Sequence, residues 1–198
     1  MGQAGKNEVG SHLPRPCNAH QLVLVLANTG LRVGEARNLK WSDIEYFPDD
    51  DGYEQVAIMA RGKTGSREVV ARTPDVKEYF GRILNLRCEE LGSKPSGSDY
   101  VFCHKDGRQI HSFKKGFAAL VKAAKVEFDN MGERRVIYSL RHTYATFRLQ
   151  QPVNAYALAQ NMGTSLKMLE AFYGHTSNRA MASELTKTRK RRAKQFAE

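Results

Sequence analysis

The spacing of the apolar residues changes twice along the chain, and this limits the fold more than any other feature of the sequence. A buried helix is predicted from Asn18, where residues 22–27 are all apolar, and Gly30 is its natural end. A second short helix is predicted at about 32–40, with Val33, Ala36 and Leu39 on one face. The spacing then becomes that of strands, interrupted by turn signals at 48–52 and 62–66. The strands are predicted at residues 44–47, 53–60 and 67–72.

Helical spacing returns after the strands and continues to the end of the chain. The next helix is predicted over residues 73–91, with Thr73 as its N-cap and Pro74 at its first helical position. Further helices are predicted at about 112–126, 139–150, 153–162, 165–173 and 178–195. The sequence therefore predicts a mainly α fold with a small antiparallel β-sheet near its N-terminal side, an α+β arrangement.

Composition excludes several classes of protein. The chain has 198 residues, which is typical of one domain, and no apolar run approaches the ~18 residues of a membrane helix. The first 16 residues lack the apolar segment of a secretory signal, and three scattered cysteines favour neither a disulfide framework nor a zinc site. These features indicate an intracellular, reduced protein.

The net charge suggests the kind of partner. Lys and Arg total 31 against 21 Asp and Glu, which gives +10 and favours nucleic acid or an anionic surface. Six of the eight residues from Lys187 to Lys194 are basic, and none is acidic. This tail is typical of a solvated helix end, or of a DNA-contacting segment that uses Lys187, Arg189, Lys190, Arg191 and Arg192.

One apparent nucleotide motif is misleading. Gly62-Lys63-Thr64 resembles the end of a phosphate-binding P-loop, but that motif requires Gly where this chain has Ala57. The same three residues are predicted to join two strands, whereas a P-loop joins a strand to a helix. The sequence does not favour a nucleoside triphosphatase.

Two arginines lie where a helix begins. Arg32 follows Gly30, in the first turn of the next predicted helix, and Glu35 lies close behind it. Ser139 is the predicted N-cap of a later helix, which places Arg141 and His142 in its first turn, where the helix dipole favours an anion. Each segment alone is also typical of ordinary surface residues, whereas a rigidly held arginine would suit a phosphate.

A third segment ends in tyrosine. Met168, Leu169 and Phe172 form an apolar stripe at helical spacing, and Tyr173 closes that helix beside Gly174. Such a tyrosine is commonly a packed aromatic residue.

The order of these segments is more specific than any one of them. Gly-Leu-Arg-x-x-Glu, a turn lysine, Leu-Arg-His-Thr, Met-Gly-Thr-Ser and Tyr-Gly-His follow one another from about residue 20 to 176. Together they resemble the catalytic domain of the tyrosine recombinases, the phage integrase family. The resemblance implies the catalytic-domain fold of the DNA breaking-rejoining enzymes.

The resemblance implies a reaction and a role for each residue. The family cuts and rejoins DNA through a 3′-phosphotyrosyl intermediate, without metal, ATP or other cofactor. By resemblance, Tyr173 is the nucleophile, Arg32 and Arg141 hold the phosphate oxygens, and Lys63 protonates the leaving 5′-oxygen.

The chain departs from the family pattern at two positions. Tyr138 stands where the family commonly has His, and Thr164 stands where it has His or Trp. Tyrosine is a poor base near pH 7, so the general base stays open. His142 and His175 are the candidates by their place in the sequence.

The resemblance also implies organisation and partners. We expect a lead-in at 1–16, the catalytic domain at 17–176 and a basic helical tail at 177–198, without the family's N-terminal DNA-binding domain. The expected partner is double-stranded DNA, with a homotetramer on DNA for the intact protein and a monomer for this chain alone. We expect a bacterial or phage-encoded protein of the cytoplasm and nucleoid, with no membrane partner.

Other functions stay open at this point. A type IB topoisomerase-like enzyme would use the same chemistry to relax DNA, and a catalytically impaired module would only bind it. Arg32, Lys63, Arg141 and Tyr173 argue against impairment, whereas Tyr138 and Thr164 leave it open. A general RNA-binding protein has little support, because no recognition motif is present.

Overall fold

The chain forms two compact units. The computed structural model describes residues 16–62, 65–151 and 153–173. The first unit ends at Tyr144 and the second begins at Ala145, and each is described by itself.

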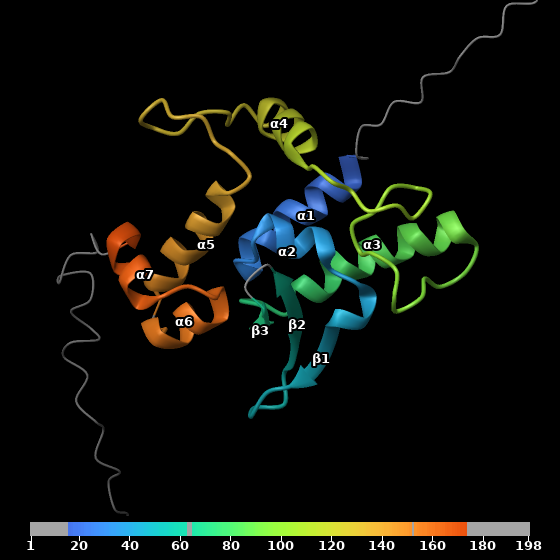
Figure 1. Cartoon of the computed structure of the whole chain (residues 1–198), viewed down its shortest axis with the longest axis horizontal. Coiled ribbons are helices and arrows are strands. Elements are labelled where there is room, and N and C mark those ends of the chain that lie inside the picture. The colour runs from blue at the N-terminus through green and yellow to red at the C-terminus, as the bar shows by residue number, and fades with distance from the viewer. Residues whose placement is uncertain (1–15, 63–64, 152, 174–198) are drawn as a thin grey trace, which may run out of the picture. The chain divides into compact units, whose positions relative to one another are not determined.

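The first unit contains a short sheet among helices, so the predicted mainly α fold with one small antiparallel sheet is confirmed (Figure 1). A single turn of 3₁₀ helix, η1, covers Trp41–Asp43. The elements are α1 (Pro16–Thr29), α2 (Val33–Asn38), β1 (Ile44–Pro48), β2 (Glu54–Gly62), β3 (Gly65–Val70), α3 (Val76–Leu91), α4 (Lys114–Ala123) and the start of α5 (Ser139–Leu149).

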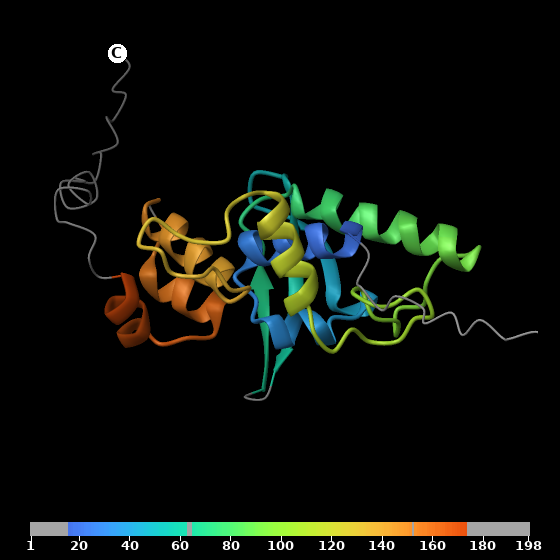
Figure 2. The same ribbon diagram turned by 90° about the horizontal axis from the view of Figure 1, so that it is seen from above.

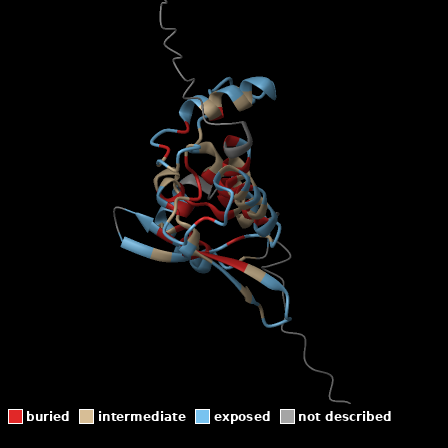
Figure 3. Ribbon diagram, turned by 90° about the vertical axis from the view of Figure 1, so that its right-hand side faces the viewer, coloured by how far each residue is buried: buried red, intermediate tan, exposed pale blue. Residues whose placement is uncertain are grey.

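The three strands follow one another in the sheet in chain order. β1 pairs with β2 and β2 with β3, both antiparallel, with Ile44 opposite Ile58 and Ala60 opposite Arg67. The middle of β2 is buried and both its ends are exposed, as Figure 3 shows by colour. Helix α2 packs on β2, so the segment that carries Arg32 is held against the sheet.

Helix α1 lies at the centre of the first unit. It contacts α2, α3 and α4 (Figures 1 and 2), and its apolar residues Leu22, Val25 and Leu26 are buried. Ile58 of β2 and Phe80 of α3 belong to the same core. This packing fixes the end of α1, where the Gly-Leu-Arg segment begins.

The second unit contains the end of α5, α6 (Ala155–Met162) and α7 (Leu166–Tyr173). Asn154 caps α6 by accepting hydrogen bonds from two backbone N–H groups of its first turn. Helices α6 and α7 pack on one another and bury Leu158, Met162 and Leu169.

Two predicted helix caps are wrong. Helix α3 begins at Val76, because residues 73–75 form a turn in which the Val76 N–H donates to the Thr73 carbonyl. Ser139 is the first residue of α5, and its hydroxyl accepts from the N–H of Val136 in the preceding turn. The helix predicted at 112–126 is shorter, Lys114–Ala123, and the one predicted at 178–195 lies outside the described residues.

The longest described helix, α3, has 16 residues. No helix in the described part of the chain combines the length and apolar character that crossing a membrane requires.

Candidate active site

Arg32 lies at a fixed junction between two helices. Gly30 ends α1 in the left-handed conformation with φ +65°, and its N–H donates to the Leu26 carbonyl at 3.0 Å. Arg32 has φ −72° and ψ 148°, so it lies at the N-cap position of α2. The prediction that it lies in the first helical turn is wrong. Arg32 is extended there because its backbone N–H donates to Glu35 Oε2 at 2.8 Å.

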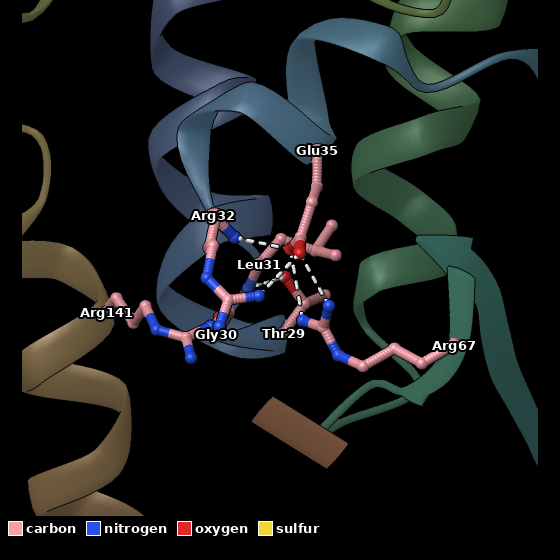
Figure 4. A network of polar contacts seen from close by, with 7 residues as sticks. All are labelled: Thr29, Gly30, Leu31, Arg32, Glu35, Arg67 and Arg141. Atoms are coloured by element: carbon pink, nitrogen blue, oxygen red, sulfur yellow. Dashed lines mark hydrogen bonds and ion pairs between the residues drawn. The ribbon is translucent and has the colours of Figure 1, made fainter. Parts of the chain in front are cut away.

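Glu35 is the centre of a polar network (Figure 4). Its side chain is 3% exposed and accepts hydrogen bonds from two arginines. Arg32 Nη1 donates to Oε1 at 2.8 Å, while Arg67 donates to Oε1 through Nη1 at 2.5 Å and to Oε2 through Nη2 at 3.0 Å. Burial alone would raise the pKa of Glu35, but the hydrogen bonds from Arg67 and Arg32 outweigh it and lower that pKa.

Arg141 reaches the same junction from α5. It is 6% exposed, and its Nη1 donates to the carbonyl oxygen of Gly30. Burial and then the positive charge of Arg32 lower the pKa of Arg141. Two like charges, 109 positions apart in the sequence, are therefore held close together (Figure 4).

Tyr138 and His142 lie beside Arg141 on the same segment. Their rings pack edge to face with centroids 4.9 Å apart, and Tyr138 is 49% exposed. Burial, followed by the charge of Arg141, lowers the pKa of His142 below its usual 6.5. His142 is therefore mainly neutral at pH 7, the form in which imidazole accepts a proton.

The end of β2, which leads into the turn that contains Lys63, lies beside Glu35. A Cβ added to Gly62, the last residue of β2, would be 3.3 Å from Glu35 Oε1. Strand β3 begins at Gly65, so the strands predicted on both sides of Lys63 are confirmed. Lys63 itself lies outside the described residues.

The remaining predicted residues belong to the second unit or are not described. Thr164 follows Gly163, and its N–H donates to the Ala159 carbonyl at 2.9 Å. Tyr173 is the last residue of α7, at the helix end where it was predicted. The rest of the predicted set lies outside the described residues: His175, Lys187, Arg189, Lys190, Arg191 and Arg192.

The cluster of Arg32, Glu35, Arg67 and Arg141 is suited to binding an anion. Three arginines against one glutamate leave a formal charge of +2, and guanidinium forks match pairs of phosphate oxygens. Arg32 is 39% exposed, so an anion can reach it from solvent. Within the described ranges, no group of three or more His, Cys, Asp or Glu side chains could hold a metal ion.

Arg67 belongs to the site but was not among the residues predicted for it. The predicted strand 67–72 begins at Arg67, whereas β3 begins at Gly65, and the pattern does not indicate which element the Arg67 side chain meets. The signal available was an arginine in the strand just after the lysine turn, but its partner Glu35 is 32 positions away.

Comparison with known proteins identifies the family of the chain. The model of the phage integrase family matches residues 8–190. The tyrosine recombinase XerA of Thermococcus onnurineus is 27% identical over 149 residues, which cover 73% of this chain and 46% of that protein. The tyrosine recombinase XerS of Lactococcus lactis is 28% identical over 171 residues, or 83% of this chain and 43% of that protein. The chain thus spans less than half of each of these relatives.

Solved structures show the same fold. A crystal structure of XerA recombinase matches with a TM-score of 0.62 at 25% identity, over 87% of this chain and 58% of that one. The structure of XerH site-specific recombinase bound to its difH substrate, after cleavage, has a TM-score of 0.64 at 20% identity, over 85% of this chain and 45% of that one. The family model covers far more than half of the sequence, and the chain therefore belongs to the phage integrase family.

Proposed function

We propose that the chain is the catalytic domain of a site-specific DNA recombinase that cuts and rejoins double-stranded DNA through a 3′-phosphotyrosyl intermediate. The observation that carries this proposal is the convergence of Arg32 and Arg141 beside Glu35. Glu35 offsets only one of the three guanidinium charges in the cluster, and the remaining positive charge favours an anionic ligand. The family to which the chain belongs makes a DNA phosphodiester the anion of choice.

In this mechanism, Arg32 and Arg141 bind the non-bridging oxygens of the phosphate that is attacked. Negative charge grows on these oxygens as phosphorus becomes five-coordinate, so fixed guanidiniums stabilise the transition state more than the ground state. Arg141 donates a hydrogen bond to the Gly30 carbonyl at the junction that carries Arg32, and this bond holds the two arginines next to each other. Their charge serves the role that a metal ion has in many phosphoryl-transfer sites.

Tyr173 is the proposed nucleophile. A free tyrosine has a pKa of about 10 and attacks poorly at neutral pH, so it requires a neighbouring cation or a base. Attack by its hydroxyl oxygen forms the tyrosyl–phosphate bond and breaks the bond from phosphorus to the 5′-oxygen, which Lys63 protonates. The new ester keeps the energy of the broken bond, so rejoining requires no ATP.

His142 is the proposed general base. It is mainly neutral at pH 7 and packs on Tyr138, and of the two candidate histidines it is the one that the structure describes. It is proposed to receive the proton of Tyr173. Thr164 is proposed to hydrogen-bond the phosphate in place of the usual His or Trp. The basic residues from Lys187 to Arg192 are proposed to contact DNA, and the intact protein to assemble as a tetramer on it.

A strand-transfer assay tests the function. The substrates are duplexes that carry the junctions at the ends of the genetic element encoding the protein. Arg32→Gln and Arg141→Gln should each lower the single-turnover cleavage rate at least a hundredfold, whereas Arg82→Gln, an exposed arginine of α3, should leave it unchanged. Equal rates for all three variants would contradict the proposed phosphate site.

The assay also separates the alternatives. A product in which strands have exchanged indicates a recombinase, and relaxation of supercoiled plasmid without exchange indicates a topoisomerase-like enzyme. Binding of the junction DNA without cleavage would indicate a catalytically impaired module. The departures from the family pattern at Tyr138 and Thr164 would account for such a loss of activity.

A further inference from the structure

Arg67 connects the sheet to the helix junction through one carboxylate. It lies on β3 opposite Ala60 of β2, and its side chain is 19% exposed. Both its Nη atoms donate to Glu35, one to each carboxylate oxygen. This fork-to-fork pairing fixes the plane of the carboxylate, which a single hydrogen bond would not do.

Glu35 both supports and opposes the binding of an anion at this site. Its carboxylate receives both the backbone N–H and the Nη1 of Arg32, so it orients that arginine. However, its negative charge is almost fully buried within the same cluster, and it would cancel one of the two phosphate-binding charges. The third cation, Arg67, offsets that carboxylate.

We infer that Arg67 is a positioning residue of the phosphate site, which fixes Glu35 and preserves the +2 charge that Arg32 and Arg141 present to the phosphate. The inference rests on the proposed function. With Arg67 in place, the cluster holds three positive charges and one negative charge. Without Arg67, the net charge falls to +1, and the buried carboxylate competes with the phosphate for Arg32.

The chain offers a matched control in Arg61. It lies on the neighbouring strand β2, and its Nε and Nη2 donate to Oδ1 of Asp43 at 3.0 and 2.9 Å. Asp43 is a buried carboxylate like Glu35, with a side chain that is 3% exposed. Replacing Arg61, whose side chain is 62% exposed against 19% for Arg67, therefore removes a more exposed arginine–carboxylate pair from the same sheet, one with a different carboxylate.

The test measures the affinity for inorganic phosphate. The side-chain Nε–Hε signals of Arg32 and Arg141 are followed by NMR while phosphate is added, and thermal unfolding is recorded for each variant. Arg67→Gln should weaken phosphate binding about tenfold, because one unit of positive charge is lost from the cluster that binds the anion. Arg67→Lys restores the charge but not the fork, so its loss should be about threefold, whereas Arg61→Gln should change the affinity less than twofold.

The double variant Glu35→Gln with Arg67→Gln is the decisive sample. It restores the net charge of +2, so its phosphate affinity should recover to within about threefold of the wild type. A merely structural role for Arg67 predicts the opposite, because the double variant lacks more contacts than Arg67→Gln alone. If Arg67→Gln fails to fold, Arg67→Lys and the double variant carry the same test.

Three results would overturn the inference. They are wild-type affinity in folded Arg67→Gln, no recovery in the double variant, and a loss in Arg61→Gln as large as that in Arg67→Gln. Absence of phosphate-dependent shifts at Arg32 and Arg141 in the wild type would overturn the phosphate site and the inference with it. Absence of DNA cleavage with the expected phosphate affinities would overturn the proposed recombinase function alone.

Discussion

Arg141 donates a hydrogen bond to the carbonyl of Gly30, which joins the start of α5 to the end of α1 within a buried contact. The same glycine lies against the ring of Tyr144, which is one turn of α5 beyond Arg141. A Cβ added to Gly30 would be 2.5 Å from Cδ1 and 2.7 Å from Cε1 of that ring. The glycine therefore fixes the distance at which α5, and with it Arg141, approaches Arg32.

Replacement of Gly30 by Ala should destabilise the protein by about 3 kcal/mol. The new methyl group requires a left-handed backbone at φ +65° and overlaps the Tyr144 ring, and both effects are unfavourable. Urea unfolding measures the change. Gly34→Ala is the matched control, since its Cβ would meet nothing within 4 Å in helix α2, and it should be neutral or more stable by up to about 1 kcal/mol. Equal losses in the two variants would contradict the close contact.

Glu35 should make the stability of the protein depend on pH in the acid range. Its pKa is lowered in the folded state, because hydrogen bonds from Arg67 and Arg32 outweigh the effect of burial, and its ordinary value is 4.5. The stabilising contribution is therefore complete above pH 4.5 and is lost as the pH falls through the lower folded-state pKa. Denaturant unfolding at several pH values should show a smaller loss below pH 4.5 in Glu35→Gln than in the wild type. Identical pH profiles would contradict the lowered pKa.

The pKa of His142 should respond to the charge at position 141. Burial and the neighbouring guanidinium both lower this pKa from 6.5, so removal of the charge in Arg141→Gln should raise it part of the way back. Arg141→Lys keeps the charge and should leave the pKa closer to its wild-type value. NMR titration of the imidazole signals of the wild type and both variants measures the effect. An unchanged pKa in Arg141→Gln would show that burial alone accounts for the shift.

The sequence predicted most of the elements but not the contacts between their side chains. The strands and the helices of the first unit were found because each follows from local spacing and from turn residues such as Gly30 and Gly52. The cap at Thr73 was misassigned because Asp75, two residues later, lies at the N-cap of α3. Local preference does not decide between such neighbouring positions.

In the candidate site, too, most residues could be predicted from the sequence but their contacts could not. Arg32, Glu35 and Arg141 were found from helix boundaries and from the resemblance, but the bond between Arg141 and Gly30 joins residues 111 positions apart. Arg67 was missed because an alternating strand pattern gives only the face of a residue, and its pairing with Glu35 depends on how α2 packs on the sheet. Such tertiary contacts are not encoded in any short segment.

The residue that forms the bond to DNA can be identified directly. The wild-type protein is incubated with a nicked duplex of an authentic junction and denatured, and the trapped adduct is digested and sequenced by tandem mass spectrometry. We expect a nucleotide 3′-phosphate on Tyr173 and no adduct in Tyr173→Phe. Attachment at another residue, or an adduct that persists in Tyr173→Phe, would contradict this expectation.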